Sequence, residues 1–310
     1  MGKLHGGLTV QSGVPPDLIH QNHDLLYAFY RLGHRMYFAP EWPREFAPDF
    51  ILLNEAELWS WTPNGLFHES PPADWRPKGL DIPIIVWCHD PFLNFRKELV
   101  VAKGADAVLV SQKPWVENFR QEVPAGVPVY WLNAAAVNTN LMLPESAEVP
   151  EEYDVGFVGA VSHPYYADRQ RLLGKLEGAG LKVFVHDSSK RPPLYRRDMI
   201  AAYSKCKIVF NHVRPDTMGT GNARIYEAVA ARKLLLTNWL PGVRDLGFEP
   251  GVHYAEYGTD DECVELALRY ARDDGGRRKI AAAAVEFALR EHTWEARAAK
   301  IIEIAGPMLG

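Results

Sequence analysis

The segment from Asn211 to Thr237 carries residue types that would bind a phosphate-containing ligand. An apolar run leads into a loop that closes with Gly219-Thr220-Gly221. Glycines ahead of a helix let the backbone approach a ligand closely and adopt positive φ. Asn222 is a favoured N-cap residue type, so we expect a helix to begin there. The N–H groups and the positive dipole end of such a helix favour a phosphate.

Two charged residues follow in the first turns of this expected helix. A cation such as Arg224 is unfavourable at a helix N-terminus, and an anion bound beside it would reverse that sign. Glu227 lies three residues later on the same face, where its carboxylate can accept hydrogen bonds from the two hydroxyls of a ribose. A capped amphipathic helix with an Arg–Glu surface pair explains the same residues, and the sequence leaves both interpretations open.

A second pair of candidate residues closes the apolar run that ends at Cys88. His89 and Asp90 follow this run, and ligands bind outside the carboxyl ends of strands in open α/β sheets. Asp90 is a candidate base for an acceptor hydroxyl, or it orients His89 for that role. The alternative is an aspartate that caps the turn before Pro91. A phosphohydrolase His-Asp motif would need further ligands, and the sequence shows none at suitable spacings.

Other polar residues follow the expected strands of the second half. His163, Asn211 and the pair His186-Asp187 should edge a nucleotide pocket there. For each of them, ordinary hydrogen bonding within a loop is the alternative interpretation.

In the first half, Glu55 and Glu57 follow an expected strand and precede Trp59 and Trp61. Flat aromatic rings stack on sugars, so these residues are candidates for lining a cleft that binds a sugar-containing acceptor substrate. A polar edge above tryptophans of the core is the simpler interpretation.

The candidate residues lie between short apolar runs rich in β-branched and aromatic residues. Continuous runs of this kind are typical of strands buried on both faces of a parallel sheet. Helical patterns at 17–32, 169–179, 194–204 and 222–232 separate them, which predicts α/β units with right-handed crossovers. The runs lie at 36–39, 50–53, 82–87, 107–110, 127–132, 155–158, 181–185, 207–211 and 234–237.

The pattern pauses at 143–152, where two prolines, four acidic residues and no apolar period indicate a linker. We therefore expect a first Rossmann-like domain over 1–145 and a second over 151–290. The tail from 260 to 309 has no strand pattern and predicts two or three helices. The stretch 54–81 gives no clean period, and we expect it to be irregular.

The stretch GNARIYEAVAARKLLLT, which ends at Thr237, resembles the donor-site signature of a bacterial family, the CgeB-like or spore-maturation-protein branch of glycosyltransferases. The resemblance extends over about half the chain, from YDVGFVG at 153–159 to HTWEAR at 292–297. It is fainter in the first half, at WCHDP (87–91), DAVLV (106–110) and WLNAA (131–135). The order and spacing of several segments agree, which is more specific than any single match.

The resemblance implies a GT-B fold, in which two Rossmann-like domains face each other across a cleft. It implies that residues 291–310 form a helix that returns to the first domain. The second domain would bind the nucleotide diphosphate of a sugar donor, with Glu227 on the ribose. Asn222, Arg224 and the Gly219–Gly221 backbone would lie near the diphosphate.

The same resemblance places Gly156 and Gly159 in the first turn of the nucleotide domain, followed by a helix that carries Arg169. The leaving diphosphate would be stabilised by Arg224, a helix N-terminus and Arg169, with no metal required. Many retaining enzymes of this fold have a second glutamate eight positions before the ribose-binding one. This chain has Gly219 there, so the stereochemistry stays open.

The expected activity is therefore that of a hexosyltransferase. The donor is a nucleotide-diphosphate sugar, and the acceptor is a hydroxyl of a glycan, a protein or a small molecule. The alternatives are a GT-B-like sugar-nucleotide epimerase and a catalytically idle protein that binds a nucleotide or a glycan. A NAD-linked enzyme is disfavoured because no Gly-x-Gly-x-x-Gly follows the first strand of either half.

Composition narrows the remaining classes. The net charge is -5, so the composition lacks the excess of basic residues that is typical of nucleic-acid-binding proteins. Three distant cysteines have no metal spacing and fit a reducing compartment. His20 and His23 are too few to hold a metal. No stretch approaches roughly 18 consecutive apolar residues and no signal peptide is apparent, so we expect a cytoplasmic protein without a transmembrane segment.

Overall fold

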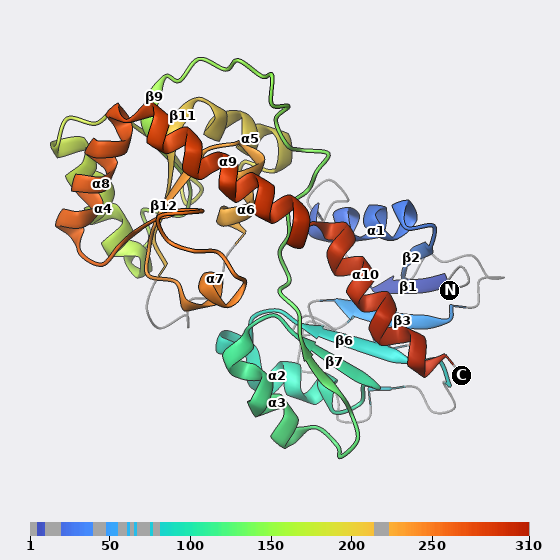
Figure 1. Cartoon of the computed structure of the whole chain (residues 1–310). Coiled ribbons are helices and arrows are strands. Elements are labelled where there is room, and N and C mark those ends of the chain that lie inside the picture. The colour runs from blue at the N-terminus through green and yellow to red at the C-terminus, as the bar shows by residue number, and fades with distance from the viewer. Residues whose placement is uncertain are drawn as a thin grey trace. The chain divides into compact units, whose positions relative to one another are not determined.

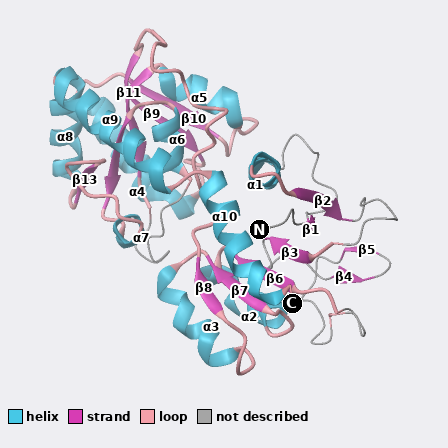
Figure 2. Cartoon of the chain, turned by 45° about the vertical axis from the view of Figure 1, so that its right-hand side comes forward, coloured by secondary structure: helices cyan, strands magenta, loops and turns pink. Residues whose placement is uncertain are grey.

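The computed structural model describes residues 5–9, 20–39, 48–54, 61–62, 65–66, 75–76, 81–213 and 223–309. The chain divides into two compact units. Unit 1 comprises Met1–Ala134 and Trp294–Gly310, and unit 2 comprises Ala135–Thr293. Each unit is built on a parallel β-sheet with helices (Figures 1 and 2), which confirms the predicted α/β class.

The main sheet of unit 1 has six parallel strands in the order β2-β1-β3-β6-β7-β8. They are β1 (His5–Thr9), β2 (Arg35–Ala39), β3 (Phe50–Asn54), β6 (Ile84–Cys88), β7 (Ala107–Val110) and β8 (Val129–Trp131). The three strands β3, β6 and β7 are buried along their whole length, as the continuous apolar runs predicted. A separate antiparallel pair joins β4 (Trp61–Thr62) to β5 (Gly65–Leu66).

Helices cover the sheet of unit 1. They are α1 (His20–Arg31), α2 (Pro91–Ala102), α3 (Val116–Glu122) and α10 (Trp294–Ala305), with short 3-10 turns η3 (Lys113–Trp115) and η6 (Gly306–Met308). Helices α2 and α3 share one apolar core with β3, β6, β7 and β8. Helix α10 packs against α1 (Figure 1), and Arg31 and Glu295 form an ion pair of 2.8 Å between them.

The sheet of unit 2 has five parallel strands in the order β10-β9-β11-β12-β13. They are β9 (Tyr153–Gly159), β10 (Val183–Asp187), β11 (Cys206–Asn211), β12 (Leu234–Asn238) and β13 (Ala255–Tyr257). From β9 the chain goes to the edge strand β10 and then returns to the other side of β9 as β11. The switch point of the sheet therefore lies between β9 and β11.

Two layers of helices enclose the sheet of unit 2 (Figure 2). Helices α4 (Ala167–Gly178) and α8 (Asp260–Arg272) pack on one face. Helices α5 (Arg196–Ser204), α6 (Arg224–Ala230) and α9 (Asp274–Glu291) pack on the other. The short elements η4 (Pro164–Tyr166) and α7 (Pro241–Asp245) follow β9 and β12. No helix in the described part of the chain is long and apolar enough to cross a membrane.

The boundary between the units lies before the predicted linker. The segment 143–152 is hydrogen-bonded to unit 2, because Leu143 accepts from Arg232 at 2.7 Å and donates to the carbonyl of Ala230 at 2.9 Å. At its other end the N–H of Glu152 donates to the carbonyl of Lys205 at 2.8 Å. Prolines and acidic residues give this segment no period of its own, yet its backbone binds to unit 2.

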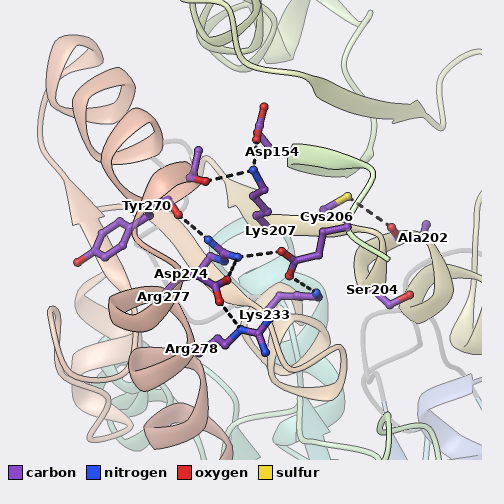
Figure 3. A network of polar contacts seen from close by, with 12 residues as sticks. Asp154, Ala202, Ser204, Cys206, Lys207, Lys233, Tyr270, Asp274, Arg277 and Arg278 are labelled. Atoms are coloured by element: carbon purple, nitrogen blue, oxygen red, sulfur yellow. Dashed lines mark hydrogen bonds and ion pairs between the residues drawn. The ribbon is translucent and has the colours of Figure 1, made fainter. Parts of the chain in front are cut away.

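A polar network at the amino ends of the strands holds the end of this segment (Figure 3). Arg277 of α9 is only 3% exposed and donates to the carbonyl of Tyr270 at 2.8 Å. It also donates to Glu151 at 2.8 Å and contacts Asp274. The second carboxylate oxygen of Glu151 accepts from Lys233 at 2.7 Å. One carboxylate therefore joins the segment before β9 to α9 and to the start of β12.

We predict that Glu151→Ala lowers the free energy of unfolding by about 3 kcal/mol, because it removes the shared carboxylate of two poorly exposed cations. For a protein of this size the loss corresponds to about 5–10 °C in Tm. The neighbouring Glu152→Ala is the matched control. Its pair with Lys205 is about half exposed, so its loss should change the free energy by less than about 0.5 kcal/mol. Equal effects of the two substitutions in urea denaturation would contradict this assignment.

Candidate functional site

The switch point of unit 2 brings several of the predicted residues together. Strands β9 and β11 are hydrogen-bonded neighbours, and they end at Gly159 and Asn211. The crevice outside the carboxyl ends of two such strands is where open α/β sheets bind their ligands. The side chains of Arg169 and Arg224 reach this same edge from helices α4 and α6. Topology therefore gathers residues that are up to 66 positions apart in the sequence.

The guanidinium group of Arg224 is anchored by three hydrogen bonds. Its Nη1 donates to Asn211 Oδ1 at 2.6 Å, its Nη2 to the carbonyl of Val158 at 2.9 Å, and its Nε to the hydroxyl of Tyr203 at 3.2 Å. It lies over the ring of Phe157, 4.7 Å from the ring centre. The group is thus fixed at the ends of both switch-point strands before any ligand binds.

Arg169 joins the two segments that leave the switch point. Its Nη1 donates to the carbonyl of Ala160 at 2.7 Å, and its Nη2 to the carbonyl of His212 at 3.0 Å. The guanidinium stacks between the rings of Phe157 and Tyr166, at 4.8 and 4.3 Å from their centres. Its Nε is buried and has no hydrogen-bond partner. Arg169 therefore holds two backbone segments in place at this edge and also contributes a positive charge to it.

The two arginines form a pair of like charges on a single phenyl ring. Burial, and next the charge of Arg224, lower the pKa of Arg169 to about 10. Within the described part of the chain, Arg169 hydrogen-bonds to carbonyl groups and to no carboxylate. Burial would lower the pKa of Arg224, but its interactions with Tyr203 and the Glu227 carboxylate outweigh burial and raise the pKa. Among the described residues, Arg169 has no such carboxylate partner. The electrostatics of this edge therefore favour an anionic ligand.

Glu227 lies one turn along α6 from Arg224, as the spacing predicted. Its side chain is half-buried and forms no hydrogen bond or ion pair with the described residues. Burial raises the pKa of its carboxyl group, and the charge of Arg224 only partly offsets this. A carboxylate that is removed from water without donors is unfavourable. Two hydroxyl groups of a ligand would supply the missing donors.

Gly159 is required by the closeness of Arg224 to the strand end. Its φ of 145° is disfavoured for residues with a side chain. A Cβ atom at this position would lie 3.1 Å from Nη2 of Arg224 and 3.2 Å from the ring of Phe157. The glycine therefore leaves room for the guanidinium group. This requirement explains a glycine at position 159 more specifically than a tight turn does.

Asn211 and Tyr203 act through Arg224. Asn211 is fully buried, and its amide donates to the hydroxyl of Thr237 at 2.9 Å while its carbonyl oxygen accepts from Arg224. Tyr203 of α5 is also fully buried, and burial raises the pKa of its hydroxyl to about 12. Tyr203 was not predicted as a site residue, because a tyrosine on the inner face of a helix is typical of a core. Both residues position the guanidinium group.

His163 and Asp187 edge the same region and make loop contacts. His163 is exposed, and its Nδ1 accepts from the N–H of Tyr165 at 3.2 Å. Asp187 ends β10 and accepts from the N–H of Val161 at 3.0 Å and from the hydroxyl of Ser162. Burial would raise the pKa of Asp187, but these hydrogen bonds outweigh it and lower the pKa. Asp187 thus fixes the segment that follows β9.

Some predicted residues of the nucleotide site lie outside the described residues. They are Gly219, Thr220, Gly221 and Asn222. Helix α6 is described from Arg224, and Ala223 before it already has helical dihedral angles, with φ -53° and ψ -22°. The predictions for the glycine loop and the N-cap therefore stay predictions. In unit 1, the same holds for Glu55, Glu57 and Trp59, and nothing is described of the Trp61 side chain.

In unit 1, His89 lies at the carboxyl end of β6 beside the end of β3. Its Nε2 is 2.7 Å from Oδ1 of Asn54, the last residue of β3. The edge of its ring faces Trp87, at 5.3 Å between centres. Burial lowers the pKa of His89 to about 3, so the imidazole is neutral near pH 7. Asn54 was not predicted, although its position as the polar end of the run FILLN was a usable signal.

Asp90 occupies the N-cap position of α2, but its side chain makes no capping hydrogen bond. Its N–H donates at 3.1 Å to Oε1 of Glu98, a fully buried residue about two turns along α2. Asp90 therefore occupies the N-cap position, as the alternative interpretation expected. Its side chain does not form the capping hydrogen bond that this interpretation requires. Its predicted catalytic role stays a prediction.

The described residues hold no group of three His, Cys, Asp or Glu side chains that could bind a metal ion. The three cysteines Cys88, Cys206 and Cys263 are buried and form no disulfide.

Comparison with known proteins concerns the fold and residues 157–303. Residues 157–303 match a family model described as "Glycosyl transferase-like". A comparison with curated protein sequences finds no match. The chain is similar in structure to HepE from Anabaena in complex with UDP and glucose, with TM-score 0.64, 14% identity and coverage of 98% of this chain and 100% of that one.

Two further solved structures are similar over almost their whole length. Sucrose-phosphate synthase from Thermosynechococcus elongatus gives TM-score 0.63 at 12% identity, with 99% of both chains covered. A glycosyltransferase from Rickettsia africae gives TM-score 0.61 at 13% identity, with 100% of this chain and 99% of that one covered. Residues 157–303 thus match a glycosyl transferase-like family model, and the chain as a whole shares the fold of these proteins.

Proposed function

We propose that this chain is a metal-independent glycosyltransferase of the GT-B type and of the CgeB-like branch. It would transfer a hexosyl group from a nucleotide-diphosphate sugar to a hydroxyl of a glycan, a protein or a small molecule. The match of residues 157–303 supports the class of reaction. The similarity to HepE, which was solved with UDP and glucose, supports a donor of this kind.

The observation that carries the proposal is the pair of arginines at the switch point. In the transfer, the bond between the anomeric carbon and a diphosphate oxygen breaks, and negative charge develops on the leaving diphosphate. Arg169 and Arg224 are fixed by protein contacts, so they would stabilise this charge without reorganising. We propose that the Gly219–Gly221 backbone and Asn222 add N–H donors to the same group.

Glu227 completes the proposed donor site. Its carboxylate lacks donors among the described residues, and ribose hydroxyls would provide two of them. The acceptor oxygen forms the new bond to the anomeric carbon, and its proton must pass to a base. We propose that Asp90 takes this proton, and that the neutral His89 assists by hydrogen bonding.

The proposal is tested by a thermal-shift screen of UDP, GDP, dTDP, CDP and their sugars, with Mg²⁺ and with a chelator. One nucleotide should raise Tm by roughly 5–10 °C at about 100 times its Kd, equally in both buffers. A shift that appears only with Mg²⁺ would contradict metal independence. No shift with any nucleotide would contradict the donor site itself. Release of the nucleoside diphosphate from the sugar nucleotide then distinguishes an enzyme from an idle binding protein.

We predict that Arg169→Gln weakens binding of the nucleoside diphosphate at least about tenfold, because it removes one of the two cations of the site. Arg171→Gln is a matched control on the same helix. Arg171 is exposed and pairs with Asp168 and Asp260, so its substitution should change the affinity by less than about twofold. Titration calorimetry measures both, and equal effects would show that only the general charge of α4 matters.

We predict that Glu227→Gln weakens nucleotide binding and stabilises the free protein. The pKa of Glu227 is raised in the folded state, so the stability that it contributes is greatest below the unfolded value near 4.5 and is lost as pH rises. The variant should therefore match the wild type near about pH 4.5 and exceed its free energy of unfolding near about pH 7.5. A variant that is less stable at the higher pH, or that binds nucleotide like the wild type, would contradict this role.

A further inference from the structure

An exposed tryptophan follows strand β12 at the same edge of the unit 2 sheet. Trp239 is 61% exposed, which is unusual for the largest apolar side chain. Among the described aromatic residues of unit 2, only Trp239 and Tyr165 are exposed. Both follow carboxyl ends of strands, Tyr165 after β9 and Trp239 after β12. These two strands flank β11, so exposed aromatic rings follow the strands on both sides of the switch point.

A chain of hydrogen bonds links the end of β12 to the cationic site. Thr237 is the register partner of Asn211 and accepts a hydrogen bond from its amide. Asn211 in turn accepts from Arg224. Trp239 is two residues beyond Thr237, so their Cα atoms are at most about 7 Å apart. Trp239 therefore begins the connection that leaves the strand beside β11, at the same edge of the sheet as Arg224.

The backbone before and after Trp239 is fixed. Both polar groups of the Asn238 side chain bind the backbone of Val213, with 2.8 Å to its N–H and 2.6 Å to its carbonyl. Leu240, on the other side, is 1% exposed and belongs to the core of the unit. The backbone that carries the exposed indole is thus held on both sides, and this reduces the backbone entropy lost when a ligand binds.

We propose that Trp239 is a specificity-determining residue whose indole stacks on a flat ring of the donor. Both the nucleobase and the sugar ring of the donor have an extended face with little charge, which is what stacking on an indole requires. The inference rests on the proposed function, because it needs a donor whose diphosphate lies at Arg169 and Arg224. Stacking would bury an aromatic face that the protein otherwise leaves in water.

The test compares the wild type with Trp239→Ala, Trp239→Phe and Tyr30→Ala by titration calorimetry. The probes are UDP with UDP-glucose, and the corresponding GDP, dTDP and CDP pairs. Tyr30 of α1 is 70% exposed and makes a matched control, because its loss removes a similar exposed ring from unit 1. Trp239→Ala should weaken binding about ten- to hundredfold. Trp239→Phe should keep most of the affinity, and Tyr30→Ala all of it, with little change in Tm for any variant.

Comparing each nucleoside diphosphate with its sugar nucleotide shows which ring of the donor stacks on the indole. Equal losses for the nucleoside diphosphate and its sugar nucleotide place the indole on the nucleobase, and a loss confined to the sugar nucleotide places it on the sugar. A wild type that binds a nucleotide, with a Trp239→Ala variant that binds it equally well, would overturn this proposal alone. A wild type that binds none of the probes would overturn the proposed function together with it.

Discussion

The site depends on one electrostatic constraint, the presence of two guanidinium groups against the single ring of Phe157. Arg169 and Arg224 approach this ring at 4.8 and 4.7 Å, and the pKa of Arg169 is lowered in consequence of burial and of its neighbour. Carbonyls, an amide and a phenol hold both groups, and the carboxylate of Glu227 acts on Arg224 and raises its pKa. Arg169 is therefore the charge of the pair that burial and its neighbour destabilise, and a bound anion would stabilise it.

Sheet topology explains why these charges meet. The strand order of unit 2 separates the connections that leave β9 and β11 at their carboxyl ends, and the side chains of Arg169 and Arg224 meet at this edge. The same logic applies within unit 1, where Asn54 and His89 end neighbouring strands and contact each other. In both units the apolar runs form the sheet, and polar side chains follow them at the carboxyl ends of neighbouring strands.

Strands with a continuous apolar run were predictable, and strands without one were not. All nine predicted strands appear, with ends that differ by up to two residues. Strand β1 was missed because HGGLT has two glycines and no apolar run, and α2 was missed because Pro91 was taken for a turn rather than a first helical residue. Arg224 and Glu227 were predictable from local spacing. Asn211 was predicted at this edge from its place at the end of a strand, but its contact with Arg224 was not, and Tyr203 was not predicted at all. Those contacts are set by packing between distant segments.

The most direct measurement is a crystal structure of the protein with the nucleoside diphosphate that binds most tightly. The account predicts diphosphate oxygens within about 3 Å of guanidinium nitrogens of Arg169 or Arg224, and both ribose hydroxyls within the same distance of the Glu227 carboxylate. A nucleotide bound elsewhere would contradict it, as would a ribose turned away from Glu227 while the diphosphate is held by other residues.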